Sequence, residues 1–390
     1  MMIPRTQPHL GTLVLLTALT VLSLNMFLPA LPAMRDAFGV SEAVMGVAIS
    51  GYMICAAALQ LIMGPLSDRI GRRPVILGFL TLYVLASIVC MLAQNIWVFL
   101  GARMLQAVAV GGGVLASAVV RDLFEGRQAA AKLGTIASAM AIAPMLAPML
   151  GGAVDTAFGW RAVFVIYAAF GLMLLALALW DLGETRRSAT RPEIRDYLDL
   201  LREPLFWAYT LCMAFAVGTF YIFLTGAPFV AAAVFGLSSR DIGIGLGSIT
   251  MGFMCGSAIS TRLVMRLGPL PLIIVGRSVA VAGLICGLVG FSFGAASVAL
   301  FFAASICVGL GNGFTMPNAN AGALSVRPEL AGTAAGVSGA VMLLIGALLT
   351  GVATAFLSTE ATPLKLLSLM FAAVCVSCVF VFFARGLERR

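Results

Sequence analysis

The chain has 390 residues, of which 61% are hydrophobic and 10% are charged, and its formal net charge is +8. A soluble domain has roughly 25% charged residues, so this composition excludes a soluble globular protein and indicates a membrane protein. His9 is the only histidine, which argues against a histidine-based metal site or catalytic triad. The sequence also has no Gly-Lys-Ser/Thr phosphate loop. We therefore expect neither an enzyme nor a metal or other cofactor.

Twelve apolar runs, most of about 18 to 25 residues, follow one another along the chain with short charged loops between them. Each run is long enough to cross a hydrocarbon core of about 30 Å as an α-helix. We therefore predict an all-α membrane protein with twelve transmembrane helices. The predicted spans are 10–31, 43–63, 75–94, 97–120, 131–154, 162–181, 205–227, 241–264, 271–291, 295–317, 331–356 and 364–384.

The longest polar loop, near 182–204, divides the predicted spans into two sets of six. A short repeat supports an internal duplication, because Arg, Gly and Pro recur with the same spacing in 68–74 and in 265–271, each after the second span of its half. We predict an N-terminal six-helix bundle at 1–182, a cytoplasmic linker at 183–204 and a C-terminal six-helix bundle at 205–390. Two related bundles around a central cavity suit alternating access by rocking.

The positions of Lys and Arg predict the orientation of the chain. With the N-terminus in the cytoplasm, eighteen of the 24 basic residues lie in cytoplasmic loops or tails, four lie in outer loops, and Arg103 and Arg277 lie within spans. The positive-inside rule then places both termini in the cytoplasm. The basic excess faces the leaflet that carries anionic lipid, so the lipid bilayer explains the net charge and no nucleic-acid partner is expected.

The sequence 64–74, Gly-Pro-Leu-Ser-Asp-Arg-Ile-Gly-Arg-Arg-Pro, follows the second predicted span. An ordinary positively charged loop explains its arginines, but not its paired glycines or Asp68. A carboxylate at this position is suited to the positive N-terminal end of another helix. The stretch resembles the signature of the major facilitator superfamily, in which this carboxylate faces the eleventh helix, here beginning near Ala331–Gly332. The resemblance implies that the stretch controls conformational gating through Gly64, Asp68, Arg69, Gly71, Arg72 and Arg73.

Further stretches resemble one branch of that family, the bicyclomycin and chloramphenicol resistance exporters. The resemblance implies export of small amphipathic molecules from the bacterial cytoplasm in exchange for protons, by a monomer in the inner membrane. Prolines and paired glycines in the fifth span are expected to supply a hinge, at Pro144, Pro148, Gly151 and Gly152. The stretches that carry the resemblance are 28–32 (LPALP), 103–106 (RMLQ, with Ala107 in place of the usual Gly), 121–122 (RD), 143–152 (APMLAPMLGG) and 220–228 (FYIFLTGAP).

Asn25 is the lone polar side chain in the stretch 24–32, LNMFLPALP. In the exporter branch this position is commonly Asp and is thought to take part in proton coupling, whereas an amide does not titrate. Asn25 and Arg103 each lie about 9 Å inside the outer end of a predicted span, so we expect them to face each other. Gln106, one turn from Arg103, is expected to share its hydrogen bonds. Burying the guanidinium in a span is costly unless it is paired or meets water; the alternative is that it snorkels to the outer interface.

Three hypotheses follow from the loss of this acid. In the first, the protein is still a proton antiporter and the titrating group lies elsewhere, with Asp155 as the candidate and Arg103 taking part. In the second, Arg103 receives an anionic or strongly polar group of the cargo. In the third, coupling is lost and the protein is a facilitator. A membrane ligand sensor is the alternative from another functional class.

In the family that the motifs resemble, the first, fourth, seventh and tenth helices line the cargo cavity. The candidate aromatic residues supply apolar contact area and the amides supply orientation. For Phe220 and Tyr221, lipid contact or core packing is an equally good interpretation. The residues nominated as substrate-binding are Asn25, Tyr52, Arg103, Gln106, Phe220, Tyr221 and Asn312.

Overall fold

The computed structural model describes residues 8–124, 126–185, 199–295 and 297–388. Within these ranges the chain is helical and contains no strand, and twelve segments are long and apolar enough to cross a membrane. This confirms the predicted fold class and the number of spans. The long helices are α3 (Glu42–Ile70), α4 (Arg72–Leu92), α7 (Gly126–Phe158), α8 (Arg161–Asp181), α10 (Pro204–Phe235), α11 (Ser239–Leu267), α12 (Pro269–Ser292), α13 (Val298–Ser325), α14 (Ala331–Leu357) and α15 (Pro363–Glu388).

Two spans are built from shorter pieces. The first consists of α1 (Leu10–Asn25), η1 (Leu28–Ala30) and α2 (Leu31–Phe38). Pro29 and Pro32 lack the backbone N–H that an α-helix needs, so the chain tightens into a 3₁₀ turn and the last carbonyls of α1 are available to other donors. The fourth span consists of α5 (Ile96–Leu105), η2 (Gln106–Ala109) and α6 (Val110–Leu123). By contrast, α7 is one continuous helix through both of its prolines.

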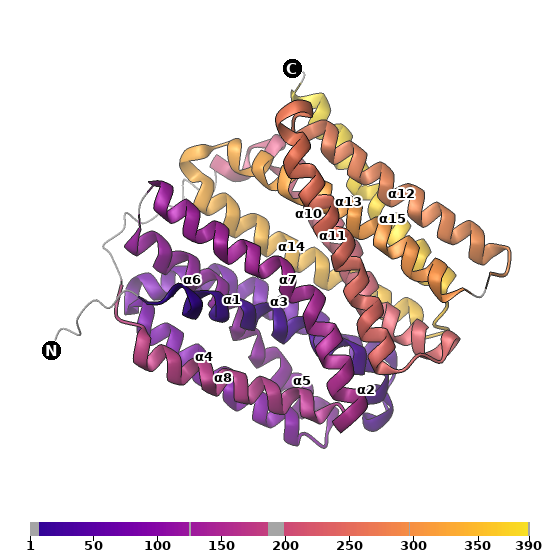
Figure 1. Cartoon of the computed structure of the whole chain (residues 1–390), viewed down its shortest axis with the longest axis horizontal. Helices are drawn as coiled ribbons and strands as arrows, with labels where there is room; N and C mark the ends of the chain where they lie inside the picture. Colours follow the sequence, from indigo (N-terminus) through magenta and orange to yellow (C-terminus); the bar gives the residue numbers. More distant parts are fainter. Residues whose placement is uncertain (1–7, 125, 186–198, 296, 389–390) are drawn as a thin grey trace.

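The helices form two groups that follow the order of the chain (Figure 1). Helices α1 to α8 pack mainly against one another, as do α10 to α15. Between the groups, α3 packs against α14 and α7 packs against α11. The exact division at 182 and 205 stays a prediction, and residues 186–198 of the linker, like the N-terminal tail before residue 8, lie outside the described residues.

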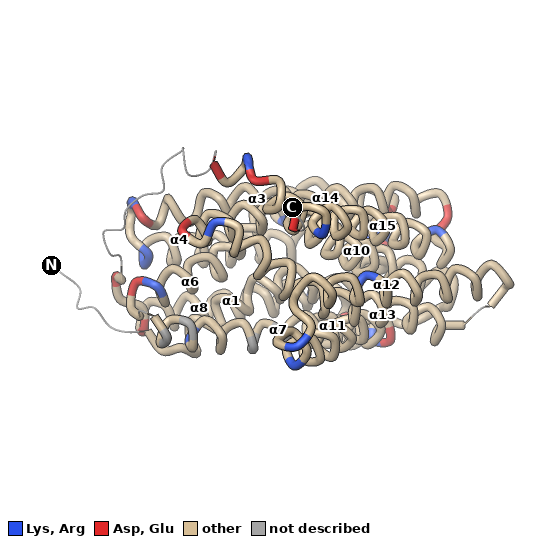
Figure 2. Tube along the Cα trace, turned by 90° about the horizontal axis from the view of Figure 1, so that it is seen from above, with Lys and Arg blue, Asp and Glu red and all other residues tan. Residues whose placement is uncertain are grey.

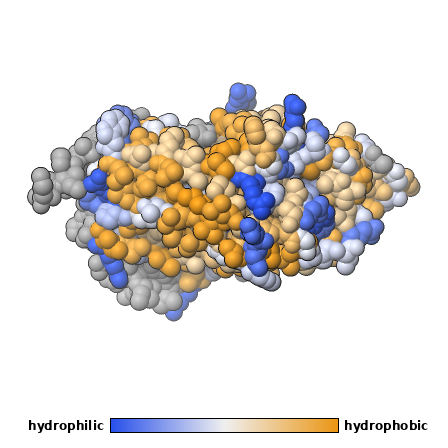
Figure 3. Space-filling view, turned by 90° about the horizontal axis from the view of Figure 1, so that it is seen from below, coloured by the Kyte–Doolittle hydropathy of each residue, from blue (hydrophilic) through white to orange (hydrophobic). Residues whose placement is uncertain are grey.

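Most charged residues lie toward the ends of the helices, while the long middle parts are largely uncharged (Figure 2). Much of the lower face is covered by hydrophobic side chains (Figure 3). Among the described residues, several large apolar side chains are highly exposed, such as Leu92 at 65% and Trp180 at 79%. Exposed apolar surface of this extent is expected where lipid replaces water around a protein.

Helices α3 and α14 pack closely along part of their length because glycines allow their backbones to approach. The contacts are evenly spaced, about two turns apart, which sets one antiparallel register for the pair. A Cβ added to each glycine would overlap a side chain of the opposite helix, or, at Gly346, lie 2.5 Å from one. The pairs are Gly46 with Thr354, Gly346 with Met53, and Gly339 with Gln60.

One turn beyond Gln60 the same two helices separate. A Cβ added to Gly64 of α3 or to Gly336 of α14 would meet nothing within 4 Å among the described residues. The same holds for Gly332 at the start of α14. Helices α7 and α11 likewise converge toward the end of the molecule that holds α2 (Figure 1). The two halves are therefore joined at the end near α2 and parted at the end where α3 ends and α14 begins.

Candidate functional site

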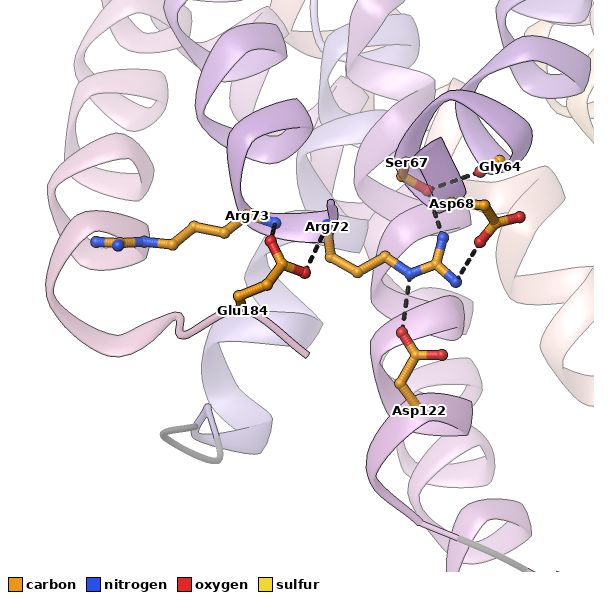
Figure 4. A network of polar contacts seen from close by, with 7 residues as sticks. All are labelled: Gly64, Ser67, Asp68, Arg72, Arg73, Asp122 and Glu184. Atoms are coloured by element: carbon orange, nitrogen blue, oxygen red, sulfur yellow. Dashed lines mark hydrogen bonds and ion pairs between the residues drawn. The ribbon is translucent and has the colours of Figure 1, made fainter. Parts of the chain in front are cut away.

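Arg72 is the centre of a polar network at the parted end (Figure 4). Its side chain is almost fully buried, and it forms ion pairs of 2.6 Å with Asp68 and 2.8 Å with Asp122. Its third nitrogen donates to the hydroxyl of Ser67, which in turn donates to the carbonyl of Gly64. Charge-assisted bonds of this kind are stronger than neutral ones. The network joins the end of α3, the start of α4 and the end of α6 in one rigid unit.

Glu184 caps the start of α4 from the segment after α8. Its carboxylate accepts the backbone N–H groups of Arg72 at 2.9 Å and Arg73 at 3.3 Å. These are N–H groups that a helix start leaves without an intrahelical partner, and a negative charge is favourable there. Gly71 precedes them with φ of +113°, and a Cβ on it would lie 2.5 Å from the Glu184 carboxylate. Glycine is required here both for the turn and for access of the cap.

The predicted contact of Asp68 with the start of the eleventh helix is not made in this conformation. Asp68 pairs with Arg72 instead, and Gly332 has open space around it. The side chain of Arg73 donates to the carbonyl of Leu179 at 3.0 Å, and Arg69 is exposed in the last turn of α3. The physical reason is that α3 and α14 diverge before they reach Asp68.

Arg103, in α5, is completely buried, so it does not snorkel to the interface. Its Nη1 donates to Gln106 at 2.7 Å, as expected, and its Nη2 donates to the carbonyl of Ser23 at 2.6 Å. The guanidinium lies 4.1 Å from the ring centroid of Phe27 and 4.5 Å from that of Tyr52, within the range of cation–π attraction. In the part of the chain that the structure describes, no carboxylate pairs with it.

The C-terminal end of α1 takes the place of a carboxylate beside Arg103. Ser23 lies in the last turn of α1, where the helix dipole is negative and carbonyl groups are available to donors from other helices. The break at Pro29 therefore provides the acceptor that compensates the buried cation. Tyr167 of α8 donates to the same turn, at 2.9 Å to Leu22 and 3.3 Å to Ser23.

Asn25 is buried but does not bond to Arg103, which corrects the expectation that the two face each other. Its Nδ2 donates to the carbonyl of Val21 at 2.8 Å, and its Oδ1 has no partner among the described residues. Successive helical residues are about 100° apart, so Ser23 and Asn25 face different sides of α1 although their depths are similar. Arg103 therefore reaches Ser23.

Gln106 extends the buried network toward α4. Its Nε2 donates to the hydroxyl of Ser87 at 2.7 Å, and Ser87 donates to the carbonyl of Tyr83 at 2.7 Å. The sequence analysis missed Ser23, Ser87 and Tyr167, because polar residues of this kind are common in packed helices. Only their spatial convergence on Arg103 distinguishes them.

Asn312 belongs to a second cluster, in the C-terminal half. Its Oδ1 accepts from Arg277 of α12 at 2.5 Å and its Nδ2 donates to the carbonyl of Ala216 at 3.0 Å. Arg277 also donates to Thr315 at 2.9 Å. Both ends of the Asn312 amide are thus occupied within this half, and the structure does not bring Asn312 to the Arg103 cluster.

Phe220 and Tyr221 are half-buried in α10, and their rings meet edge to face with centroids 5.8 Å apart. A Cβ at Gly346 would lie 3.1 Å from the Tyr221 ring and 2.5 Å from Met53. Tyr221 therefore lies where α10, α14 and α3 meet, in the middle of the contact between the halves. Of the seven nominated cargo residues, these two keep partly exposed side chains.

The joined end contains the residues nominated in α7. A Cβ at Gly151 would overlap the Met26 carbonyl, one at Gly152 would overlap that of Ser239, and one at Gly243 would overlap that of Pro148. Thr156 accepts from the backbone of Arg240 at 3.1 Å. Gly152 and Gly243 are sites of close approach between the halves, whereas Gly151 packs against the end of the first span within the N-terminal half. Pro144 lies one turn before Pro148 in the unbroken helix.

Asp155 lies within the contact between α7 and α11, which is called the seam below. It is 8% exposed, and the hydroxyl of Ser239, the first residue of α11, is its hydrogen-bonding partner from the other half. Gly152, three residues earlier, and Thr156, the next residue, also contact α11. The carboxylate is therefore covered by the contact between the two halves.

The comparisons decide the family. The model of the Major Facilitator Superfamily matches residues 13–351. The chain belongs to this superfamily. The chain is 32% identical over 371 residues to a chloramphenicol resistance protein of Pseudomonas aeruginosa, covering 93% of this chain and 88% of the relative. It is 28% identical over 375 residues to multidrug resistance protein D of Escherichia coli, covering 94% and 93%.

A solved structure with the same architecture confirms the fold. A bacterial homologue of the human lysosomal transporter Spinster, in an inward-facing and occupied conformation, superposes with a TM-score of 0.81 at 17% identity, over 97% of this chain and 96% of the other. As a member of the superfamily, the 390-residue chain is a multi-pass membrane transporter and not an enzyme. Among the described residues, no cluster of His, Cys, Asp and Glu is suited to hold a metal ion.

Proposed function

We propose that this transporter exports small amphipathic molecules across the bacterial inner membrane by alternating access, as a monomer with both termini in the cytoplasm. The observation that carries the proposal is the unequal contact between the halves, tight at the α2 end and open around Gly64, Gly332 and Gly336 at the other. Such an arrangement is one of the two states that a rocking transporter alternates between. The distribution of Lys and Arg supports an opening toward the cytoplasm.

The register of α3 and α14 indicates how the parted end closes. Continuing the observed pairing past Gln60 brings Gly64 opposite Gly336 and Asp68 opposite Gly332. In that state the Asp68 carboxylate would reach the positive start of α14, the contact that the sequence predicts. Asp68 therefore exchanges Arg72 for the α14 terminus as the transporter turns over.

An amphipathic cargo that is not anionic fits the buried polar groups best. Arg103 has no exposed surface, and its two terminal nitrogens are bonded within the N-terminal half. An anion would have to displace those bonds to reach the guanidinium. The drug-resistance names of the relatives agree with an amphipathic cargo, and the half-buried Phe220 and Tyr221 supply apolar contact area.

Asp155 is the proposed proton carrier. In the present state the seam between α7 and α11 covers it, and the opening of that seam would expose it to water. A carboxylate whose solvent access changes with the conformational state is able to load and release a proton on opposite sides of the cycle. Arg103 supports this coupling indirectly. It fixes the end of α1, and Gly151, which lies in α7 like Asp155, packs just after that end.

The test uses inverted membrane vesicles with an acidic lumen and a panel of labelled compounds that includes chloramphenicol. Uptake of a compound together with alkalinisation of the lumen is expected for the wild-type chain. The Asp155→Asn variant is expected to lower proton-coupled uptake at least tenfold, whereas Glu360→Gln, an exposed acid near the same end, leaves it unchanged.

Other outcomes separate the alternatives. Transport without any pH response would replace antiport with facilitated diffusion. Full coupled transport by Asp155→Asn would remove Asp155 as the carrier. Ligand binding without movement of any compound would replace the transport proposal with a ligand sensor.

A further inference from the structure

Arg277 is a buried cation that the proposed transport cycle does not use. It lies in α12 with 2% of its surface exposed, eight residues from the start of that helix, or about 12 Å along its axis. Nε and Nη2 donate to Thr315 and Asn312, while Nη1 is buried without a partner among the described residues. Neither partner is negatively charged. An arginine in this position is costly without a compensating anion.

A cavity of about 270 Å³ lies beside Arg277, between α12 and α15. Apart from Arg277 and Ser278 its walls are formed by apolar residues and one cysteine, Cys378. The two helices lie on the side of the C-terminal half that faces away from the N-terminal half (Figure 1). Ile285 and Phe382 on the cavity wall are 45% and 59% exposed. The cavity therefore opens toward lipid.

A second hollow, of about 560 Å³, continues the cavity toward the helix ends that lie near the C-terminus. The two share Ile274, and the second is lined by Arg385 and Glu388. Glu388 is engaged by the hydroxyl of Tyr209. The hollows together form a groove from the membrane surface to Arg277 and on to Ile285.

We propose that this groove binds a single-chain amphiphile with a carboxylate head, such as a fatty acid of the surrounding leaflet. The carboxylate accepts from Nη1 of Arg277, and the alkyl chain follows Val281, Ala282 and Ile285 toward the middle of the bilayer. The charge of Arg277 selects an anion, and a carboxylate is its natural partner. A phospholipid fits less well, because its phosphate stays at the membrane surface while Arg277 lies about 12 Å along the helix. The proposal is independent of the transported cargo.

Native mass spectrometry of the whole purified chain in an uncharged detergent tests this site, with dodecanoate as the probe and dodecanol as its neutral match. We expect one dodecanoate per chain and at least tenfold weaker binding of dodecanol. Arg277→Met is expected to weaken dodecanoate binding at least tenfold. Ala282→Trp, which fills the groove while keeping Arg277 and its bonds, is expected to do the same. Arg266→Met, an exposed arginine at the end of α11, serves as the control and is expected to bind normally.

Equal binding of dodecanol would show an apolar groove without a role for the cation and would overturn the proposal. Unchanged dodecanoate binding by Arg277→Met would do so as well. Phosphatidylglycerol that displaces dodecanoate at equal concentration would assign the groove to phospholipid instead. If Arg277→Met does not elute as a folded monomer, Ala282→Trp decides, because full dodecanoate binding by that variant contradicts the site.

Discussion

Each half of this transporter contains one fully buried arginine without a carboxylate partner in the described chain, but the two are compensated differently. Arg103 lies between two aromatic rings and against the carbonyl end of α1. Arg277 is held by the amide of Asn312 and the hydroxyl of Thr315, and it lines a cavity at the lipid-facing side. The first is enclosed on all sides, whereas the second lies at the wall of an open groove.

The difference shows how a membrane protein is able to keep a cation at depth. A helix terminus supplies a fixed partial negative charge of roughly half an elementary charge, which is sufficient when aromatic faces exclude water. Neutral amide and hydroxyl acceptors supply less, so the remaining charge is available to a ligand. A buried arginine thus stabilises the packing of the helices in one half and is a candidate binding group in the other.

Removal of Arg103 is expected to have the largest effect. Arg103→Met leaves the Gln106 amide oxygen unpaired and leaves the Ser23 carbonyl with only the 3.3 Å bond from Tyr167. An unpaired buried acceptor costs about 1–3 kcal/mol, and more where the lost donor was charged. We expect the free energy of unfolding in detergent to fall by roughly 3 kcal/mol, with loss of vesicle transport. Arg103→Lys, which keeps the charge but loses the planar guanidinium, is the matched control and should restore only part of both. An unchanged free energy of unfolding in Arg103→Met would show that the cluster does not stabilise the packing of the helices.

Asn25→Asp is expected to have an intermediate effect that depends on pH. The Asn25 amide donates to the Val21 carbonyl; a protonated acid is able to do the same, whereas a carboxylate is not. We expect stability near that of the wild type in acid and a loss of about 1–2 kcal/mol in alkaline buffer, measured by chemical denaturation across pH. A variant equally stable throughout would indicate that Arg103 turns toward residue 25 and pairs with it.

The smallest effects concern Arg277. Arg277→Met is expected to lower the free energy of unfolding by only about 1 kcal/mol, because it leaves a single acceptor, Oδ1 of Asn312, without its donor. The Asn312 amide nitrogen keeps its bond to Ala216 and Thr315 keeps its bond to Gly311. The double variant with Arg103→Met should be additive within about 0.5 kcal/mol, since the clusters share no partner. A larger coupling energy, measured with the same denaturation assay, would show that the two clusters communicate.

Local patterns were sufficient for much of the fold but not for helix rotation. Hydrophobic length located all twelve spans, but the break at Pro29 and Pro32 in the first was not predicted. The position of Arg103 along its span also indicated that it lies inside the membrane, but it did not identify Ser23 as its partner. Ser23 and Asn25 lie about 200° apart around α1, and only the packing of α1 against its neighbours α6, α7, α8 and η2 selects Ser23.

Contacts between residues distant in sequence could not be predicted either, because they depend on how the helices are placed relative to one another. Glu184 was not a candidate because nothing in its own segment shows that it folds back onto the start of α4. The contact of Asp68 with α14 was expected from the motif, but it depends on a conformation in which the two helices meet along their full length. The seam around Asp155 also required both halves to be placed.

By itself, the sequence determined that this chain crosses a membrane twelve times and belongs among transporters, because apolar length and the signature motif at 64–74 are local properties. The tertiary structure decided which groups compensate each buried arginine, where the halves meet and part, and which acid lies between them. Those outcomes depend on how helices rotate and approach one another, and in lipid that is set by close packing of small residues and a few polar bonds.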